Sequence, residues 1–378
     1  MPFVERTNVS LREEFVRFAV QEGANVSELC RRYGISRKTG YKWIQRRSTE
    51  ASADWPSDRS RRPKTSPKRT KPEIEEAVLK VRAEHPAWGG RKIRQVLLRD
   101  AAEVVPSAST VTAILGRHDR IASQASRAAT AFIRFERETP NQLWQMDFKG
   151  HFALSSGRCH PLTVLDDHSR FSLCLAACAN EQTLTVKERL TEVFRRYGLP
   201  EAMIMDNGPP WGDGPGSPWT PLTVWLLQLG VRISHGRPYH PQTQGKDERF
   251  HRTFKAEVLA AQSFSDLARC QVRFDEWRNE YNTIRPHEAL NLDVPANRYQ
   301  ISQRAFPDKL LPPEYADADV VRKVSQDGTF SFKGRILKLS KAFRGHSIAL
   351  RPKDDKGSWT ACFGAHKIKT FDLIQMTA

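Results

Sequence analysis

The hydrophobic pattern of the chain changes near residue 142, and this change constrains the fold more than any other feature. Before it, apolar residues recur at helical spacing. After it, short strand-like runs alternate with helical segments as far as residue 281. The run "LWQMDFKGHF" alternates apolar and polar residues, whereas "EAMIMDNG" is a short apolar run typical of a buried parallel strand. The pattern therefore predicts an α/β core with a mixed sheet, which we place at residues 141–290.

Length and charge indicate several domains and a polyanionic partner. A chain of 378 residues exceeds the size at which one hydrophobic core usually stops growing. Its 60 Lys and Arg outnumber its 43 Asp and Glu, which gives a formal net charge of +17. More than half of that excess falls in residues 1–71. We expect a basic N-terminal module and double-stranded DNA as the partner.

The sequence excludes several other classes of protein. It has no run of 18 apolar residues and no apolar signal-peptide core, so we expect a soluble, cytoplasmic, nucleoid-associated protein without a membrane partner. Its six cysteines are scattered without a CxxC pair or a Cys/His ladder. This spacing argues against a disulfide framework and against zinc.

Residues 1–47 predict a helix-turn-helix DNA-binding domain. Three helical stripes are separated by turns, the turn "YGIS" precedes the third, and Ser36 can cap it. The helix from Ser36 to Arg47 would enter the major groove, with Arg37, Lys38 and Lys42 facing DNA. The alternative is an ordinary helical bundle whose basic face is merely solvated.

Two further segments complete the N-terminal part. Residues 48–71 are rich in Ser, Pro, Arg and Lys, which predicts a basic flexible linker that either follows phosphates or only separates domains. Residues 72–120 predict a second helical, helix-turn-helix-like domain, and residues 121–140 a connector. The DNA-facing residues of this second domain would be Arg91, Lys92 and Arg94.

The C-terminal part changes character again. Residues 291–315 are Pro-rich and poorly patterned, which suggests a linker. Residues 316–378 contain short strands separated by turns such as "QDG" and "DDKG". This spacing predicts a small five-stranded, SH3-like β-barrel.

Three carboxylates of the α/β core are candidate metal ligands. Asp147 lies on the polar side of an amphipathic strand, Asp206 ends a buried strand, and Glu248 begins a helix. Ligand sites in open α/β sheets lie beyond the carboxyl ends of such strands. Converging carboxylates repel one another, and Mg²⁺ removes that repulsion while leaving sites for phosphate oxygens. We therefore expect Mg²⁺, with Mn²⁺ as a substitute, and phosphodiester chemistry.

Neighbouring acidic residues are weaker candidates. Asp166 and Asp167 occupy a probable strand turn, where a capping role or a salt bridge with Arg170 is expected instead. Asp247 precedes Glu248 but points about 100° away from it on the helix, so we rank it second. Taken alone, Glu248 would be a solvated glutamate paired with Arg252 at i+4.

The segment from Gly236 to Lys255 supplies candidate DNA contacts beside the carboxylates. Polar side chains crowd a loop with glycines at both ends, which we expect to lie over the scissile phosphate. On the following helix, Arg252 shares the exposed face with Glu248. The candidate DNA-binding residues of this segment are His240, Gln242, Gln244, Lys246, Arg252 and Lys255.

These segments resemble a known family. "WQMDFKG", "MDNGPPWG" and "GRPYHPQTQGKDERFHRTFK" look like the three signature segments of the DDE integrase core, an RNase H-like fold. With its N-terminal helix-turn-helix and "YNTIRPHEAL", the chain most resembles transposases of the insertion sequence 481 family, close to the insertion sequence 3 group. The interval from Asp206 to Glu248 is longer than usual, and "WGDGPGSPWT" appears as the surplus.

The resemblance implies a function and assigns residues to it. The catalytic triad falls on Asp147, Asp206 and Glu248, and Lys255 matches a lysine that contacts DNA near the active site. The chain is expected to bind terminal inverted repeats, to cleave 3′ ends and to join them to target DNA. Two DNA ends must meet, so a homodimer or larger homo-oligomer is expected on DNA. The alternative is a non-catalytic, transposase-derived DNA-binding regulator.

Overall fold

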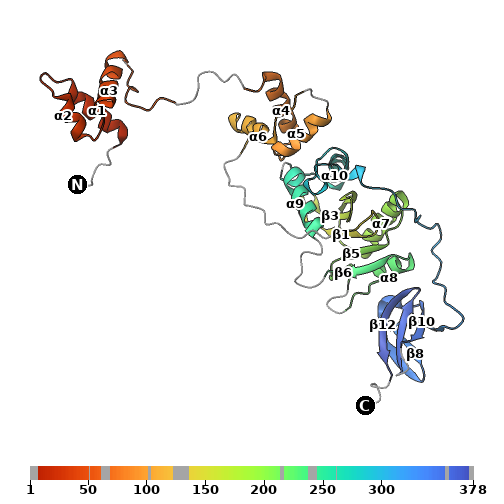
Figure 1. The fold of residues 1–378 in the computed structure, drawn as a ribbon. Helices are drawn as coiled ribbons and strands as arrows, with labels where there is room; N and C mark the ends of the chain where they lie inside the picture. The colour runs from red at the N-terminus through yellow and green to blue at the C-terminus, as the bar shows by residue number, and fades with distance from the viewer. Residues whose placement is uncertain are drawn as a thin grey trace. The chain divides into compact units, whose positions relative to one another are not determined.

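The computed structural model describes residues 7–50, 52–60, 69–100, 104–121, 136–212, 217–236, 245–260, 262–353 and 357–373. The chain divides into two compact units, residues 1–69 and residues 70–378. Figure 1 shows the elements along the chain.

The first unit is a bundle of three helices with a small core. Each helix begins at a polar residue whose side chain accepts a backbone N–H, and Ser36 Oγ accepts that of Thr39 at 3.1 Å. The core contains Phe15, Val16, Cys30, Trp43 and Trp55. The helices are α1 (Asn8–Ala19), α2 (Val26–Arg32) and α3 (Arg37–Thr49). The predicted helix-turn-helix arrangement is present.

Part of the predicted flexible linker, residues 48–71, is folded. Trp55 is 7% exposed within the core of the first unit. The Arg12 guanidinium donates to the Pro56 carbonyl at 2.7 Å and pairs with Asp58 at 2.9 Å. A single tryptophan thus ties residues 52–60 to the helices, because burying its large apolar surface is favourable.

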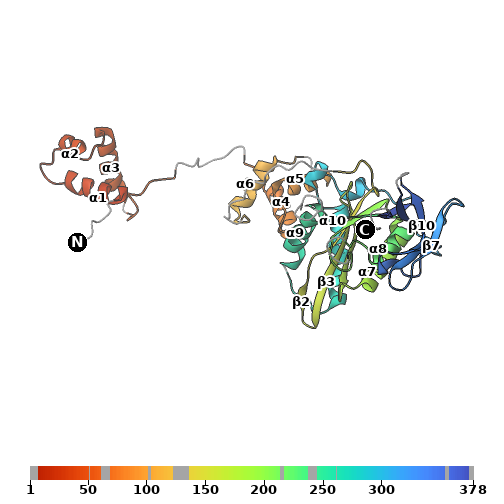
Figure 2. The same ribbon diagram turned by 90° about the horizontal axis from the view of Figure 1, so that it is seen from below.

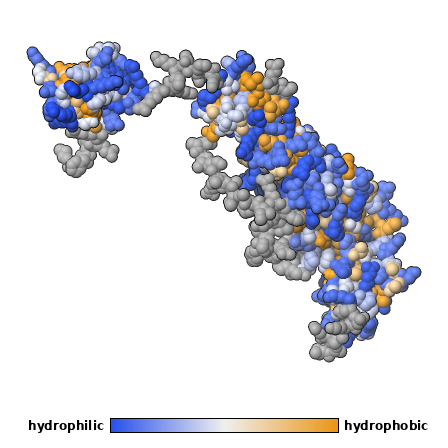
Figure 3. Space-filling model, in the orientation of Figure 1, coloured by the Kyte–Doolittle hydropathy of each residue, from blue (hydrophilic) through white to orange (hydrophobic). Residues whose placement is uncertain are grey.

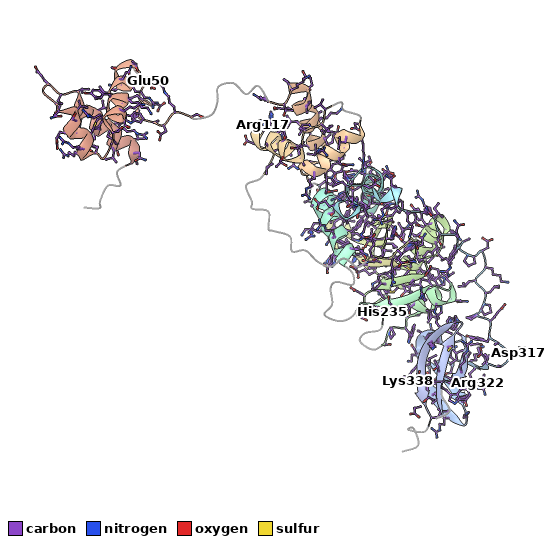
Figure 4. The ribbon with its side chains drawn as sticks, in the orientation of Figure 1. Glu50, Arg117, His235, Asp317, Arg322 and Lys338 are labelled. Carbon is purple, nitrogen blue, oxygen red and sulfur yellow. The ribbon has the colours of Figure 1, made fainter. Side chains whose placement is uncertain are left out.

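The second unit begins with three helices that have a core of their own. Val78, Trp88, Ile93, Val111 and Ile114 are fully buried there. The helices are α4 (Pro72–Glu84), α5 (Gly90–Arg99) and α6 (Ala108–Arg117). Arg117, labelled in Figure 4, pairs with the buried Glu75 at 2.6 Å.

A mixed sheet of six strands forms the centre of the second unit. Its order is β2-β3-β1-β5-β6, and β4 also pairs with β3. β1 runs parallel to β5, and β5 parallel to β6, whereas β3 is antiparallel to its neighbours β1, β2 and β4. The strands are β1 (Trp144–Phe148), β2 (Phe152–Leu154), β3 (Gly157–Asp166), β4 (Ser172–Cys178), β5 (Ala202–Met205) and β6 (Arg232–His235).

Helices cover both faces of this sheet (Figure 2). On one face, Trp144 and Met146 pack against α7 (Thr183–Tyr197) and α8 (Pro221–Gln228). On the other, Leu165 and Leu175 pack against α9 (Gly245–Phe254), the π-helical turn Lys255–Leu259 and α10 (Leu267–Thr283). The expected alternation on β1 is confirmed, but its polar side is covered by α9 rather than by solvent.

The segment expected as a linker at 291–315 lies in part against the core. Tyr299 stacks on Phe171 with ring centroids 4.4 Å apart, and Phe306 packs against the same core cluster. The short 3₁₀ turn Glu288–Leu290 precedes this segment, and the 3₁₀ turn Pro295–Asn297 lies within it. Aromatic side chains therefore hold a Pro-rich stretch that has no strand or helical pattern of its own.

The C-terminal strands form two sheets in the described residues, so the predicted closed five-stranded barrel is not confirmed. A four-stranded sheet has the order β12-β11-β10-β7, and β8 pairs with β9. Their core also includes Val224 and Leu227 of α8. The strands are β7 (Val320–Lys323), β8 (Thr329–Phe332), β9 (Arg335–Lys338), β10 (Ser347–Pro352), β11 (Ser358–Phe363) and β12 (His366–Asp372), with a 3₁₀ turn at Lys341–Phe343. Arg322 and Lys338, labelled in Figure 4, lie on these sheets.

Hydrophilic residues cover most of the visible face of the first unit in Figure 3. Over the described ranges, none of the helices is both long and apolar enough to cross a bilayer.

Candidate active site and DNA-facing residues

Asp147 stands near the end of β1 with its side chain 24% exposed. Burial, followed by the negative charge of Asp206, raises the pKa of this carboxyl to about 7. Asp206 directly follows β5, the parallel neighbour of β1, and is exposed. The two strand ends thus bring two carboxylates close enough to repel each other.

The loop after Asp206 is tied to the end of β6. The Asn207 amide donates to the Gly236 carbonyl at 2.8 Å, and the Gly236 N–H donates to Met205 O at 3.0 Å. His235, labelled in Figure 4, has its Nε2 3.2 Å from the Trp211 carbonyl oxygen. The position of Asp206 is therefore coupled to the start of the segment that leads into α9.

The first turn of α9 places its two acidic residues on different faces of the helix, as their helical spacing predicts. Glu248 is exposed, whereas Asp247 is fully buried with no hydrogen-bond partner for Oδ2. Burial raises the pKa of Asp247 well above its usual range, and the Asp147 charge raises it further. The structure therefore brings Asp147, Asp206 and Asp247 into electrostatic range of one another, and Glu248 lies exposed on the same helical turn as Asp247. No three potential ligands in the described ranges lie close enough to hold a metal ion.

The positions of the aromatic residues on α9 explain why Asp247 is buried. Phe250 and Phe254 are at most 1% exposed, and burying each contributes roughly 1.5–3 kcal/mol. Burying Asp247 costs about 1–3 kcal/mol, which is less than the two aromatic residues contribute together. The helical spacing back from Phe254 through Phe250 places Asp247 and His251 on the same buried face. This spacing is the sequence feature that predicts burial of both Asp247 and His251.

A buried polar cluster, missed by the sequence interpretation, connects this face to the strands. Thr163 Oγ1 lies 2.9 Å from Asp147 O, 2.9 Å from His251 Nε2 and 3.4 Å from Asp247 Oδ1. His251 Nδ1 is 3.9 Å from Asp147 Oδ2. Burial lowers the pKa of His251 to about 4, so its imidazole is neutral at pH 7.

The acidic turn between β3 and β4 is structural, as expected for a capping site. Asp166 accepts the Ser169 N–H at 2.7 Å, which closes the turn. Asp167 is 1% exposed, accepts the Gln145 amide at 2.8 Å and pairs with Lys246 rather than with Arg170. In this conformation Lys246 therefore holds the start of α9 to the sheet instead of projecting towards DNA.

The remaining candidates of this segment divide into two groups. Arg252 and Lys255 are exposed on α9 and at the π-helical turn that follows it. His240, Gln242 and Gln244 fall in the stretch 237–244, outside the described residues.

Helix α3 exposes the basic residues predicted to face DNA. Its Gly40 packs so closely that an added Cβ would lie 2.5 Å from Cys30 Sγ. The opposite face carries Lys38 and Lys42, and Arg37 is also exposed. Tyr41, 57% exposed, and the exposed Gln45 lie on the same side and were not predicted.

Helix α5 differs, because two of its three predicted DNA-facing residues turn towards protein. Arg91 is exposed. Arg94 Nε donates to the Pro106 carbonyl at 3.1 Å. Burial, followed by the charge of Arg285, lowers the pKa of Lys92 to about 8. Lys92 and Arg94 thus do not form the exposed basic face that the sequence suggested.

Comparison with known families follows the same division of the chain. Residues 137–241 and 229–295 match two families described as "Integrase core domain". Residues 11–64 match a helix-turn-helix domain, and residues 39–115 a homeodomain-like domain. Residues 319–378 match the "IS481 family transposase, C-terminal domain". Together with the insertion-element relatives below, these matches support an IS481-type transposase. The resemblance to that family, seen in the sequence motifs, is confirmed.

Two insertion-element proteins are similar to this IS481-type chain. An IS407 protein of Burkholderia multivorans is 30% identical over 183 residues, which cover 47% of this chain and 63% of that protein. An IS476 protein of Xanthomonas euvesicatoria is 31% identical over 157 residues, 42% of this chain and 44% of that protein. The chain thus spans less than two thirds of either relative.

Solved structures give a weaker likeness to the IS481-type chain. A chain of the simian T-cell lymphotropic virus intasome, in complex with PP2A regulatory subunit B56 gamma, is 15% identical. It covers 78% of this chain and 99% of its own, with a TM-score of 0.36.

Proposed function

We propose that the chain binds the terminal inverted repeats of an insertion sequence and catalyses metal-dependent 3′-end cleavage and strand transfer into target DNA. The observation that carries this proposal is the pair Asp147 and Asp206. They stand at neighbouring parallel strands of an integrase-type core, and the charge of Asp206 raises the pKa of Asp147. A pair of carboxylates kept so close needs a cation to be stable when both are ionised.

The residues present fit Mg²⁺. Carboxylate oxygens are hard ligands of the kind that this ion prefers, and it retains waters that phosphate oxygens can replace. Asp247 Oδ2 is buried without a hydrogen-bond partner, and burial and the charge of Asp147 raise the pKa of Asp247. Both carboxyls are therefore costly to ionise unless a cation is bound beside them.

In the proposed reaction, Asp147, Asp206 and Glu248 hold the metal ions. Bound Mg²⁺ supplies an activated attacking oxygen and stabilises the leaving one. Glu248 is the exposed carboxylate of the α9 turn, whereas Asp247 is fully buried. For these two reasons we keep Glu248 as the third ligand.

The other residues of the site orient DNA. Arg252 and Lys255 are exposed like Glu248, so their charges suit phosphates that approach this side of α9. Asn207 holds the loop of Asp206 to the end of β6 and limits the movement of that carboxylate.

Recognition of the element ends is assigned to α3. Arg37, Lys38 and Lys42 suit phosphates and guanine edges, and the exposed amide of Gln45 suits the donor–acceptor pair of adenine. Two ends must be joined in one reaction, so a dimer or larger assembly on DNA is part of the proposal.

The deciding experiment compares four isosteric variants of the full chain. We expect Asp147→Asn, Asp206→Asn and Glu248→Gln each to lower Mg²⁺-dependent cleavage at least about 100-fold. Melting temperature without metal should hold or rise, because mutual repulsion is relieved, and binding to terminal DNA should persist. Asp247→Asn should retain cleavage. If Glu248→Gln retains cleavage and Asp247→Asn loses it, the third ligand is Asp247 instead of Glu248.

A second function has one observation in its favour. Because no three ligands are gathered in the described ranges, a non-catalytic DNA-binding regulator is the alternative. Cleavage of a duplex taken from the inverted repeats that flank the gene would exclude it.

A further inference from the structure

The layer between the sheet and α9 is largely apolar and contains a cluster of polar residues. It is built by Cys159, Leu165, Leu175, Phe250, Phe254, Phe274 and Trp277. Thr163 and Asp247 are fully buried beside this layer, and His251 is 8% exposed. Buried polar groups are costly unless they are hydrogen-bonded, so their arrangement has to be specific.

Thr163 is the centre of this cluster. It pairs with Asp147 across β1 and β3, and its hydroxyl lies 2.9 Å from the Asp147 carbonyl oxygen. The same hydroxyl lies 2.9 Å from Nε2 of His251 on α9. A hydroxyl has one hydrogen to donate and can accept two. With its hydrogen on Nε2, His251 donates to Thr163 and Thr163 donates to Asp147, so both bonds form together.

We propose that Thr163 and His251 are positioning residues, which fix the end of β1 that carries Asp147 against the first two turns of α9. The inference rests on the proposed function, because Asp147 and Glu248 would share the metal ions. Glu248 lies one helical turn before His251, so a fixed link between His251 and β1 also limits how far Glu248 can lie from Asp147.

The test uses the full chain with Thr163→Val, which keeps the shape of the side chain and removes its hydroxyl. The first measurement is Mn²⁺ affinity without DNA, from the electron paramagnetic resonance signal of the free ion. The second is the Mg²⁺ concentration for half-maximal cleavage of the flanking-repeat duplex. We expect Mn²⁺ affinity to fall 10–100-fold, the Mg²⁺ requirement to rise in parallel, and DNA binding to stay unchanged.

Two control variants separate positioning from folding. Thr163→Ser keeps the hydroxyl and should restore both metal measurements. Thr360→Val makes the same change at a buried threonine of the C-terminal sheet and should leave them unchanged. If Thr163→Val does not melt cooperatively, His251→Phe is the second variant, with the same expected loss of metal affinity.

The inference is overturned if folded Thr163→Val binds Mn²⁺ like the unmodified chain, or if Thr163→Ser behaves like Thr163→Val. Asp147→Asn is the reference for the proposed function. Should Asp147→Asn also bind Mn²⁺ and cleave normally, the proposed metal site itself has failed, whatever Thr163 does.

Discussion

Helices α3 and α5 have similar sequences of basic residues but different surroundings. Each approaches a neighbouring helix through a glycine, Gly40 in α3 and Gly90 in α5. The opposite side of α3 is exposed, whereas α5 contacts a second partner: Arg99 donates to the carbonyls of Ile284 and Leu292 at 3.0 and 2.8 Å. A basic helix therefore offers its charges to DNA only where one of its faces remains unpacked.

The largest expected effect follows from removing the unit that contains α3. Deletion of residues 1–69 should abolish preference for the terminal repeats, because specific binding exceeds non-specific binding by about 10³-fold or more. The boundary is set after residue 60 because Trp55 and Asp58 belong to the folded unit. Competition binding with terminal and unrelated duplexes measures the loss. Unchanged preference would assign recognition to the second unit.

A smaller effect is expected from single charges on the two helices. Lys42→Ala should weaken binding to all duplexes and lower the salt slope by about 1, since one phosphate contact is lost. Lys92→Ala is the matched control on α5 and should leave the slope unchanged. Titrations at several salt concentrations distinguish the two. Equal slopes for both variants would remove the contrast between α3 and α5.

The smallest effect concerns the pH dependence of stability. Burial, followed by the charge of Arg285, lowers the pKa of Lys92 from 10.5 to about 8. The charges of Glu257 and Glu288 oppose this shift, and the charge of Arg249 adds to it. Between these pH values the unfolded chain binds a proton at Lys92 that the folded chain does not, so this residue makes stability rise with pH. Urea midpoints at pH 8 and pH 10 should differ less in Lys92→Met. If the difference between the two urea midpoints is the same in Lys92→Met and in the unmodified chain, Lys92 is exposed in solution.

Much of the core could be predicted, because its signals are local. The alternation in β1 and the apolar run of β5 placed Asp147 and Asp206 on two strands of one mixed sheet, and the structure makes these strands parallel neighbours. Aromatic spacing also gave the buried face of α9. Asp247 and His251 lie on that face, but a polar residue on an apolar stripe is ambiguous until its partner is known. That partner, Thr163, is 84 residues away from Asp247.

Other expectations depended on long-range pairing and were less successful. The C-terminal strands were expected at short spacing and are present, but closure into a barrel requires edge strands to meet, which strand spacing does not specify. The segment 48–71 has the composition of a linker, yet Trp55 ties part of it to a core. Composition describes an average, whereas one large apolar side chain is enough to order a short segment.

The sequence by itself determined the family, the order of the modules and the two strand-end carboxylates, because motifs and apolar periodicity act over a few residues. Tertiary structure alone decided which charges are available. Lys246 and Lys92 look like DNA contacts in the sequence, but one pairs with buried Asp167 and the other is half-buried beside Arg285. The physical reason is that desolvation and pairing depend on atoms brought together from distant parts of the chain.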